Sequence, residues 1–140
     1  MSHPIVRGII AGLVATVVLS IMMVVKGAMG VMPELNVIAM LASKMGGIVA
    51  LGWAAHFMFG VIYGVVFGLI QGKLPGPLVV RGIVLGIIGW LIMMVMVMPM
   101  MGQGLFAANM GMMAAVATFM LHVIFGAVLG LTYKLFCRCE

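Results

Sequence analysis

Charged side chains are scarce in this sequence. Asp, Glu, Lys and Arg make up 6% of the 140 residues, and only 2 residues are acidic. A soluble globular domain carries about 25% charged residues, so this chain lacks the side chains needed to cover a surface that faces water. Hydrophobic residues make up 66% of the chain. The composition excludes an ordinary soluble enzyme and a disordered chain, and it predicts an integral membrane protein.

Several functional signatures are also missing. The 7 basic residues are scattered singly, so the net charge does not indicate nucleic-acid binding. No Asp or Glu lies within an apolar stretch, which disfavours a carrier driven by carboxylates. Phosphate-binding glycine loops, zinc-protease pairs and serine nucleophile motifs do not occur. We therefore expect a protein that is not an enzyme.

Four apolar stretches are long enough to cross a bilayer as helices, which takes about 20 residues each. They are continuous rather than alternating, and this favours helices over the strands of a barrel. The first stretch is longer than the apolar part of a signal peptide, and we expect it to be retained. The stretches cover residues 5–25, 48–70, 78–98 and 112–135 approximately.

The positions of Lys and Arg predict the orientation, because cytoplasmic loops carry an excess of both. Both ends and the middle loop hold most of the basic residues, so we expect cytoplasmic termini and a location in the plasma (inner) membrane. Arg7 and Arg81 stand at matching ends of two spans, where they can reach lipid head groups. The basic residues of this side are Arg7, Lys73, Arg81, Lys134 and Arg138, against Lys26 and Lys44 on the other.

Two blocks of the sequence recur in the same order, which indicates an internal duplication. The alternative is coincidence in an apolar sequence. Each half then forms one helical hairpin, and both hairpins have the same orientation, within a single transmembrane domain of residues 1–140. The repeats cover about residues 5–72 and 78–136. The matching residues are Arg7, Gly8 and Gly12 with Arg81, Gly82 and Gly86, then His56, Gly60 and Gly64 with His122, Gly126 and Gly130.

The first repeat carries eight extra residues between its two spans. Pro33 and Glu34 suit the start of a helix, and Gly46 and Gly47 suit its end. We expect a short helix in the membrane interface here. It would act as a lid or docking surface, or else as a connector that shields the ends of the spans.

Glycines recur every fourth residue in the second and fourth spans. Small residues let helix backbones approach closely in lipid. We expect these faces to pack helices together, within the bundle or against another chain. They are Gly60, Gly64 and Gly68 in the second span and Gly126 and Gly130 in the fourth.

His56 and His122 are the ionisable side chains that lie well inside the spans. Intramembrane ionisable groups are candidates for function. Neutral imidazole can ligate haem iron or a soft metal, or pass a proton. The structural alternative is a hydrogen bond across a helix contact, which duplication would copy.

Of the 18 methionines, ten lie at the ends of the first and third spans that face away from the cytoplasm, and Met110, Met112 and Met113 open the fourth span. Thioethers suit Cu(I), so Met22, Met23, Met96 and Met98, with the two histidines and Cys137 and Cys139, are candidates for a Cu(I) path. The alternative is that methionine fills irregular gaps or faces another subunit.

The two His-x-x-x-Gly-x-x-x-Gly helices, 56–64 and 122–130, and Val80-Arg81-Gly82 resemble small uncharacterised prokaryotic membrane proteins grouped as domains of unknown function. The resemblance implies a protein with four spans and transfers no catalytic residue. We expect an accessory or assembly subunit of a larger membrane complex, with the bilayer and other subunits or its own copies as partners and no cofactor. The alternatives are a haem b or Cu(I) protein that uses His56 and His122, and a pathway for a small solute or protons.

Overall fold

The computed structural model describes residues 3–136, which form helices and turns and contain no strand in that range. Four helical spans are long and apolar enough to cross a membrane. The predicted all-helical membrane fold with four spans is therefore confirmed. In chain order the elements are α1 (Pro4–Ala28), α2 (Val37–Lys44), α3 (Val49–Ile70), the 3₁₀ turn η1 (Gln71–Lys73), α4 (Leu78–Ile92), the π-helical turn η2 (Met93–Val97), α5 (Met98–Met100), the 3₁₀ segment η3 (Leu105–Met110) and α6 (Met112–Phe136).

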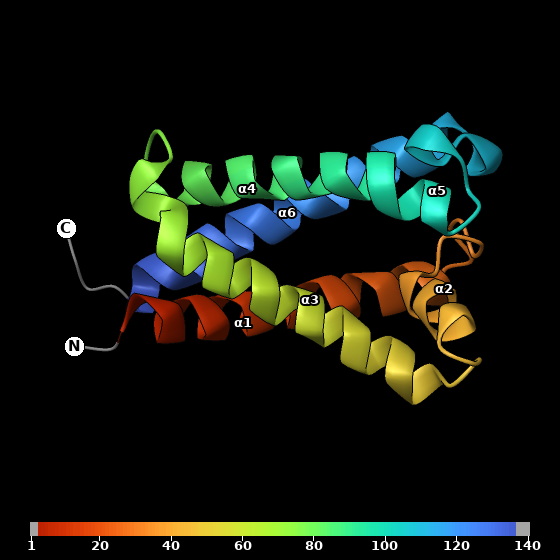
Figure 1. Cartoon of the computed structure of the whole chain (residues 1–140), viewed down its shortest axis with the longest axis horizontal. Coiled ribbons are helices and arrows are strands. Elements are labelled where there is room, and N and C mark those ends of the chain that lie inside the picture. The colour runs from red at the N-terminus through yellow and green to blue at the C-terminus, as the bar shows by residue number, and fades with distance from the viewer. Residues whose placement is uncertain (1–2, 137–140) are drawn as a thin grey trace.

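The long helices form two hairpins, α1 with α3 and α4 with α6, and α1 packs against α6 to join them. Figure 1 shows the start of α1, the η1 turn and the end of α6 together at one end, which we call the proximal end. The distal end holds α2 and η3. From the η1 turn, α3 and α4 diverge towards the distal end (Figure 1).

The first hairpin is held by direct contact between the glycine faces of α1 and α3. A Cβ atom on Gly8 would overlap the carbonyl oxygen of Gly64, and a Cβ atom on Gly12 would overlap that of Gly60. One turn further along α1, the Thr16 hydroxyl fills the space beside Gly60 and donates to the carbonyl oxygen of Gly12 at 2.8 Å. The two backbones are therefore close enough for extensive dispersion contact.

The second hairpin uses the equivalent glycines, but its register is shifted by one helical turn. A Cβ atom on Gly82 would overlap the carbonyl oxygen of Gly126, the equivalent of Gly60. In the first hairpin, the equivalent of Gly82 meets Gly64 instead, one turn further along α3. All five glycines predicted to pack helices are buried at contacts inside this chain: Gly60, Gly64, Gly68, Gly126 and Gly130.

Trp90 accounts for the shifted register, because it occupies the position that corresponds to Thr16 in the first hairpin. Its indole N–H donates to the carbonyl oxygen of Ala115 and to the Thr118 hydroxyl, both at 3.2 Å. Its ring packs edge-on against Phe119, with a centroid distance of 5.1 Å. An indole cannot fit in the space beside a glycine that a threonine fills, so the helices meet one turn away.

The short helix α2 begins later than the sequence indicated. We predicted its start at Pro33 and Glu34, but the helix begins at Val37. Asn36 is the N-cap, and its side-chain oxygen accepts a hydrogen bond from the Ala39 N–H at 3.0 Å. An N-cap asparagine satisfies a backbone donor that would otherwise lack a partner, and this outweighs the preference of proline for the first turn.

The α2 helix packs against the distal end of α3 rather than standing alone. Ile38 and Ala42 of α2 are buried, and a Cβ atom on Gly52 of α3 would overlap the carbonyl oxygen of Ile38. Gly52 therefore permits the close approach of the two helices, and α2 forms part of the distal wall of the bundle.

A π-helical turn widens the helix between α4 and α5. The Met98 N–H bonds to the carbonyl oxygen of Met93, five residues back. Pro99 follows directly; it has no N–H, and its ring would clash with the carbonyl group four residues earlier. The helix continues past Pro99 to Met100, and the wider turn accommodates the proline.

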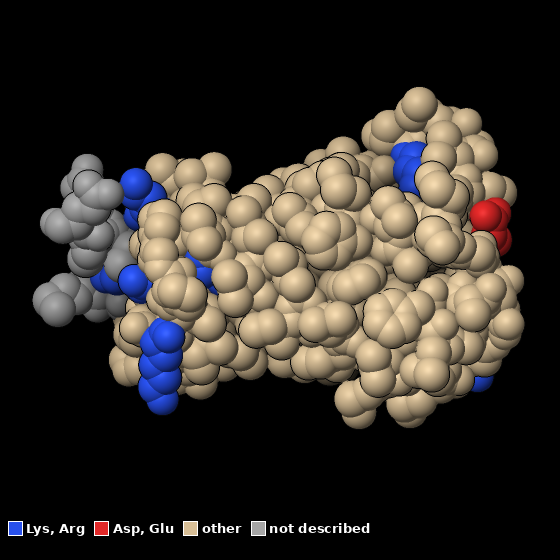
Figure 2. All heavy atoms as spheres, turned by 90° about the horizontal axis from the view of Figure 1, so that it is seen from above, with Lys and Arg blue, Asp and Glu red and all other residues tan. Residues whose placement is uncertain are grey.

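Charge gathers at the two ends of the molecule. Figure 2 shows Lys and Arg grouped near the proximal end and an uncharged flank between the ends on the face in view. Arg81 is held by its own loop, with Nε 2.6 Å from the Gly76 carbonyl oxygen and a terminal nitrogen 3.0 Å from the Gln71 side-chain oxygen. An uncharged flank between charged ends suits a protein that spans a bilayer.

Candidate functional site

A cavity of about 510 Å³ lies between the two hairpins, and both His56 and His122 line it. His56 reaches the cavity from α3 and His122 from α6. The sequence paired these residues through the duplication, and the structure brings them to one site. Side chains of α1, α2, α4, η2 and α5 complete the wall.

The His122 ring is oriented by its own helix. Its Nδ1 atom lies 2.8 Å from the carbonyl oxygen of Thr118. A carbonyl oxygen can only accept a hydrogen bond, so Nδ1 carries the hydrogen and neutral His122 has its lone pair on Nε2. The same arrangement fixes the tautomer of histidines that ligate metals. His122 therefore offers a ligand one acceptor atom.

The His56 ring, unlike that of His122, has a buried nitrogen that makes no hydrogen bond within the described residues. The residue is 8% exposed, and its buried Nε2 has no hydrogen-bond partner among residues 3–136. Trp53 and Phe57 flank the ring edge-on, with centroid distances of 6.2 Å and 6.0 Å. A buried polar atom without a partner costs about 1–3 kcal/mol, and such atoms in native proteins call for an explanation.

The remaining polar groups on the wall differ in their availability. The Thr118 hydroxyl donates to the Ala114 carbonyl oxygen at 2.8 Å, and Thr16 is satisfied within its own helix. Tyr63 crosses from α3 to α4, where its hydroxyl end contacts Gly89, and its ring meets Phe125 edge-on at 5.5 Å. The two imidazoles and the Tyr63 hydroxyl are therefore the polar groups with which a ligand would interact.

The cavity opens on the flank of the molecule. Five of its lining residues are also exposed: Phe59, Ile62 and Val66 on α3 by 42%, 47% and 36%, and Ile88 and Ile92 on α4 by 42% and 50%. The flank between the charged ends is where hydrocarbon chains would surround the protein. The mouth therefore faces lipid rather than water.

Only two of the four methionines that we predicted as metal ligands line the cavity. Met23 and Met98 line the cavity together with the histidines, whereas Met22 and Met96 do not. Met40, Met93 and Met101 also line it; they lie in the short helix, the π turn and a loop, and spacing alone did not single them out. Within residues 3–136, no three His, Cys, Asp or Glu side chains come together as a metal site. Cys137 and Cys139 lie outside the described residues.

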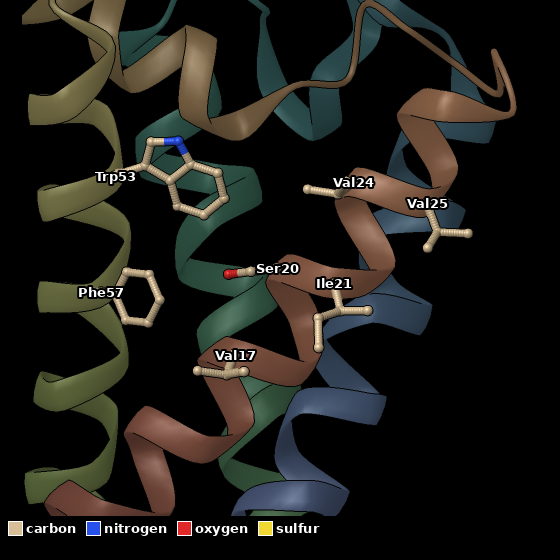
Figure 3. A pocket seen from close by; sticks show the side chains of 7 residues that line it. All are labelled: Val17, Ser20, Ile21, Val24, Val25, Trp53 and Phe57. Carbon is tan, nitrogen blue, oxygen red and sulfur yellow. The ribbon is translucent and has the colours of Figure 1, made fainter.

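A second hollow, of about 310 Å³, lies between α1 and α3 (Figure 3). It forms because the glycine contact joins these helices in their proximal halves and they separate beyond it. Ser20 faces this groove, but its hydroxyl already donates to the Thr16 carbonyl oxygen at 2.7 Å. The rest of the lining is apolar apart from the Trp53 indole, so the groove suits hydrocarbon chains rather than a specific polar ligand.

Comparisons with known proteins give a family and no function. Residues 2–139 match the model of a family of unknown function (DUF6789). No curated protein and no solved structure matches the chain.

Proposed function

The chain belongs to this family of unknown function, and we propose that it is a membrane-embedded binding protein whose ligand occupies the cavity between the hairpins. The observation that carries the proposal is the Nε2 atom of His56, which is buried at the wall of an apolar cavity without a partner. A ligand that bonded to this atom would remove the cost of leaving it unsatisfied.

Two further features support a binding role. The cavity has the size and mostly apolar lining that are typical of small-molecule sites, with a few convergent polar groups. His122 reaches it from the other hairpin with its ring orientation already fixed, and a fixed ring loses little entropy when it binds.

Mass analysis of the protein extracted in lipid nanodiscs from its own membrane tests this proposal. We expect a small molecule to co-purify with the native chain and to be lost in His56→Leu. Met58→Leu is the matched control, because Met58 lies two residues away, is 54% exposed and does not line the cavity. Native protein that is folded and carries nothing beyond bulk lipid would contradict the proposal.

We further propose that the protein resides in the plasma membrane with its proximal end in the cytoplasm. The grouping of Lys and Arg at that end (Figure 2) supports this orientation, because positive residues are retained on the cytoplasmic side. The start of α1 and the end of α6 both lie there (Figure 1), so both termini would be cytoplasmic.

Haem b is a second candidate ligand, favoured by one observation. The Nδ1 bond of His122 to a backbone carbonyl is the arrangement that orients an axial ligand and leaves Nε2 for iron. However, no Lys or Arg among the described residues lines the cavity, and haem b carries two propionates that would need cations or water. An absorption spectrum of the purified protein tests this candidate.

An accessory role in a larger complex is a separate proposal. Its support is the exposed methionine surface at the distal end, where Met100, Met112 and Met113 are exposed by 77%, 82% and 67%. Methionine side chains adapt to irregular partner surfaces. Native mass spectrometry after mild extraction would show a larger assembly, and a monomer under the gentlest conditions would contradict it.

A further inference from the structure

We infer that the ligand is a neutral, lipid-soluble phenol that enters from the bilayer and donates its hydroxyl hydrogen to Nε2 of His122. The inference rests on the proposed function, since it concerns the same cavity. It names the chemical class of the ligand, its route of entry and the atom that recognises it.

The charge of the cavity wall favours a neutral ligand. No Asp, Glu, Lys or Arg in the described part of the chain lines the cavity. A carboxylate or ammonium group would then be desolvated without a counter-charge, which costs far more than any hydrogen bond returns. Fatty acids and amines are therefore poor ligands for this site.

The position of the mouth favours a ligand dissolved in lipid. The exposed residues at the opening, such as Ile62 on α3 and Ile88 on α4, are apolar and lie on the uncharged flank. A hydrophilic solute would have to cross lipid to reach them. A lipophile that is already concentrated in the bilayer can enter sideways between α3 and α4.

The tautomer of His122 selects a hydrogen-bond donor. Nδ1 is engaged with the Thr118 carbonyl oxygen, so the ring nitrogen that remains is Nε2 with its lone pair. A hydroxyl group can satisfy this atom, whereas an ether, ester or ketone oxygen cannot. The oxygen of the same hydroxyl group can also accept a hydrogen bond from a second donor. His56 is such a donor when its own Nε2 carries the hydrogen.

Aromatic side chains on the wall favour a ring on the ligand. Phe59, Tyr63 and Phe125 line the cavity, and Tyr63 and Phe125 already pack edge-on at 5.5 Å. Aromatic pairs of this geometry gain energy beyond the area that they bury. A phenol therefore fits the wall better than an aliphatic alcohol of similar size.

Binding of two matched ligands to the full chain in nanodiscs tests the inference. The probes are para-nonylphenol and its methyl ether, which share ring and tail and differ in the hydroxyl hydrogen. Native mass spectrometry counts the ligand bound, with empty nanodiscs as the blank. We expect the phenol to bind about tenfold more tightly, the effect of one buried hydrogen bond.

Two variants then test whether Nε2 of His122 causes the preference for the phenol over its methyl ether. In His122→Leu the preference for the phenol should fall to about one, and in Met120→Leu it should persist, because Met120 is 54% exposed and does not line the cavity. Equal binding of both probes to the native chain would overturn the inference and leave the proposed function standing. Binding of neither probe above the blank would also overturn the inference, whereas the proposed function is tested separately by the small molecule that co-purifies with the native chain.

Discussion

His56 and His122 line one cavity from opposite hairpins, and their ring nitrogens are in different states. Nδ1 of His122 lies 2.8 Å from the Thr118 carbonyl oxygen, whereas Nε2 of His56 is buried without a partner in the described range. A histidine kept only for structure would be satisfied in both copies. This difference is why we propose that the cavity holds a ligand, which would satisfy His56.

The two histidines should respond oppositely to replacement by leucine in the empty protein. His56→Leu removes an unsatisfied polar group, so we expect the free energy of unfolding to rise by about 1 kcal/mol. His122→Leu removes a hydrogen bond to Thr118, so we expect a fall of about 1 kcal/mol. Unfolding in detergent mixtures, followed by tryptophan fluorescence, measures both values. A loss of stability in His56→Leu as large as that in His122→Leu would show that His56 has a structural partner.

The glycine contacts predict a position-dependent cost of adding one methyl group. Gly82→Ala places a Cβ atom against the carbonyl oxygen of Gly126, so we expect a loss of about 1–3 kcal/mol in the free energy of unfolding. Gly27→Ala is the control, because nothing lies within 4 Å of a Cβ atom there and alanine is the better helix former. Thermal melting of the two variants checks this. Equal melting temperatures would contradict the described contact between α4 and α6.

Trp90 should stabilise the second hairpin through its indole N–H. Trp90→Phe keeps a ring in place but removes the hydrogen bonds to Ala115 and Thr118, both 3.2 Å long. We expect a loss of about 1 kcal/mol in the free energy of unfolding. Trp53→Phe, in the groove of Figure 3, serves as the comparison for the change in ring size. A larger loss at Trp53 than at Trp90 would argue against this assignment.

The orientation of the chain is testable by labelling from one side. In a background without Cys137 and Cys139, we expect Arg7→Cys and Lys73→Cys to react from the cytoplasmic face of sealed vesicles. Lys44→Cys should react from the opposite face, because α2 lies at the distal end (Figure 1). A membrane-impermeant maleimide distinguishes the two faces. Reaction of Arg7→Cys and Lys73→Cys from opposite faces would overturn the two-hairpin topology.

Much of the fold was predictable because lipid imposes simple rules on sequence. Continuous apolar runs predicted the four spans to within a few residues, since backbone groups in lipid must be satisfied within each helix. The duplication paired His56 with His122. The start of α2 was mispredicted. The N-cap side chain of Asn36 sets the first residue of the helix, and this outweighs the preference of Pro33 and Glu34 for a helix start.

The cavity was not predictable, because it depends on how the helices cross. The bulk of Trp90 shifts one hairpin by a turn, and a π turn that accommodates Pro99 lies in the stretch that holds Met93 and Met98, which both line the cavity. Neither the register shift nor the π turn produces a periodic pattern in the sequence. The bond from His122 to Thr118 is compatible with the sequence spacing, but spacing alone does not show that His56 lacks the matching bond.

Nitrogen NMR of isotope-labelled histidine in nanodiscs, with and without para-nonylphenol, tests the central claim most directly. We predict that His122 carries its hydrogen on Nδ1 in the empty protein and that the Nε2 signals of His56 and His122 both shift when the phenol is added. An Nε2–H tautomer at His122, or signals that stay unchanged at saturating phenol, would contradict the account.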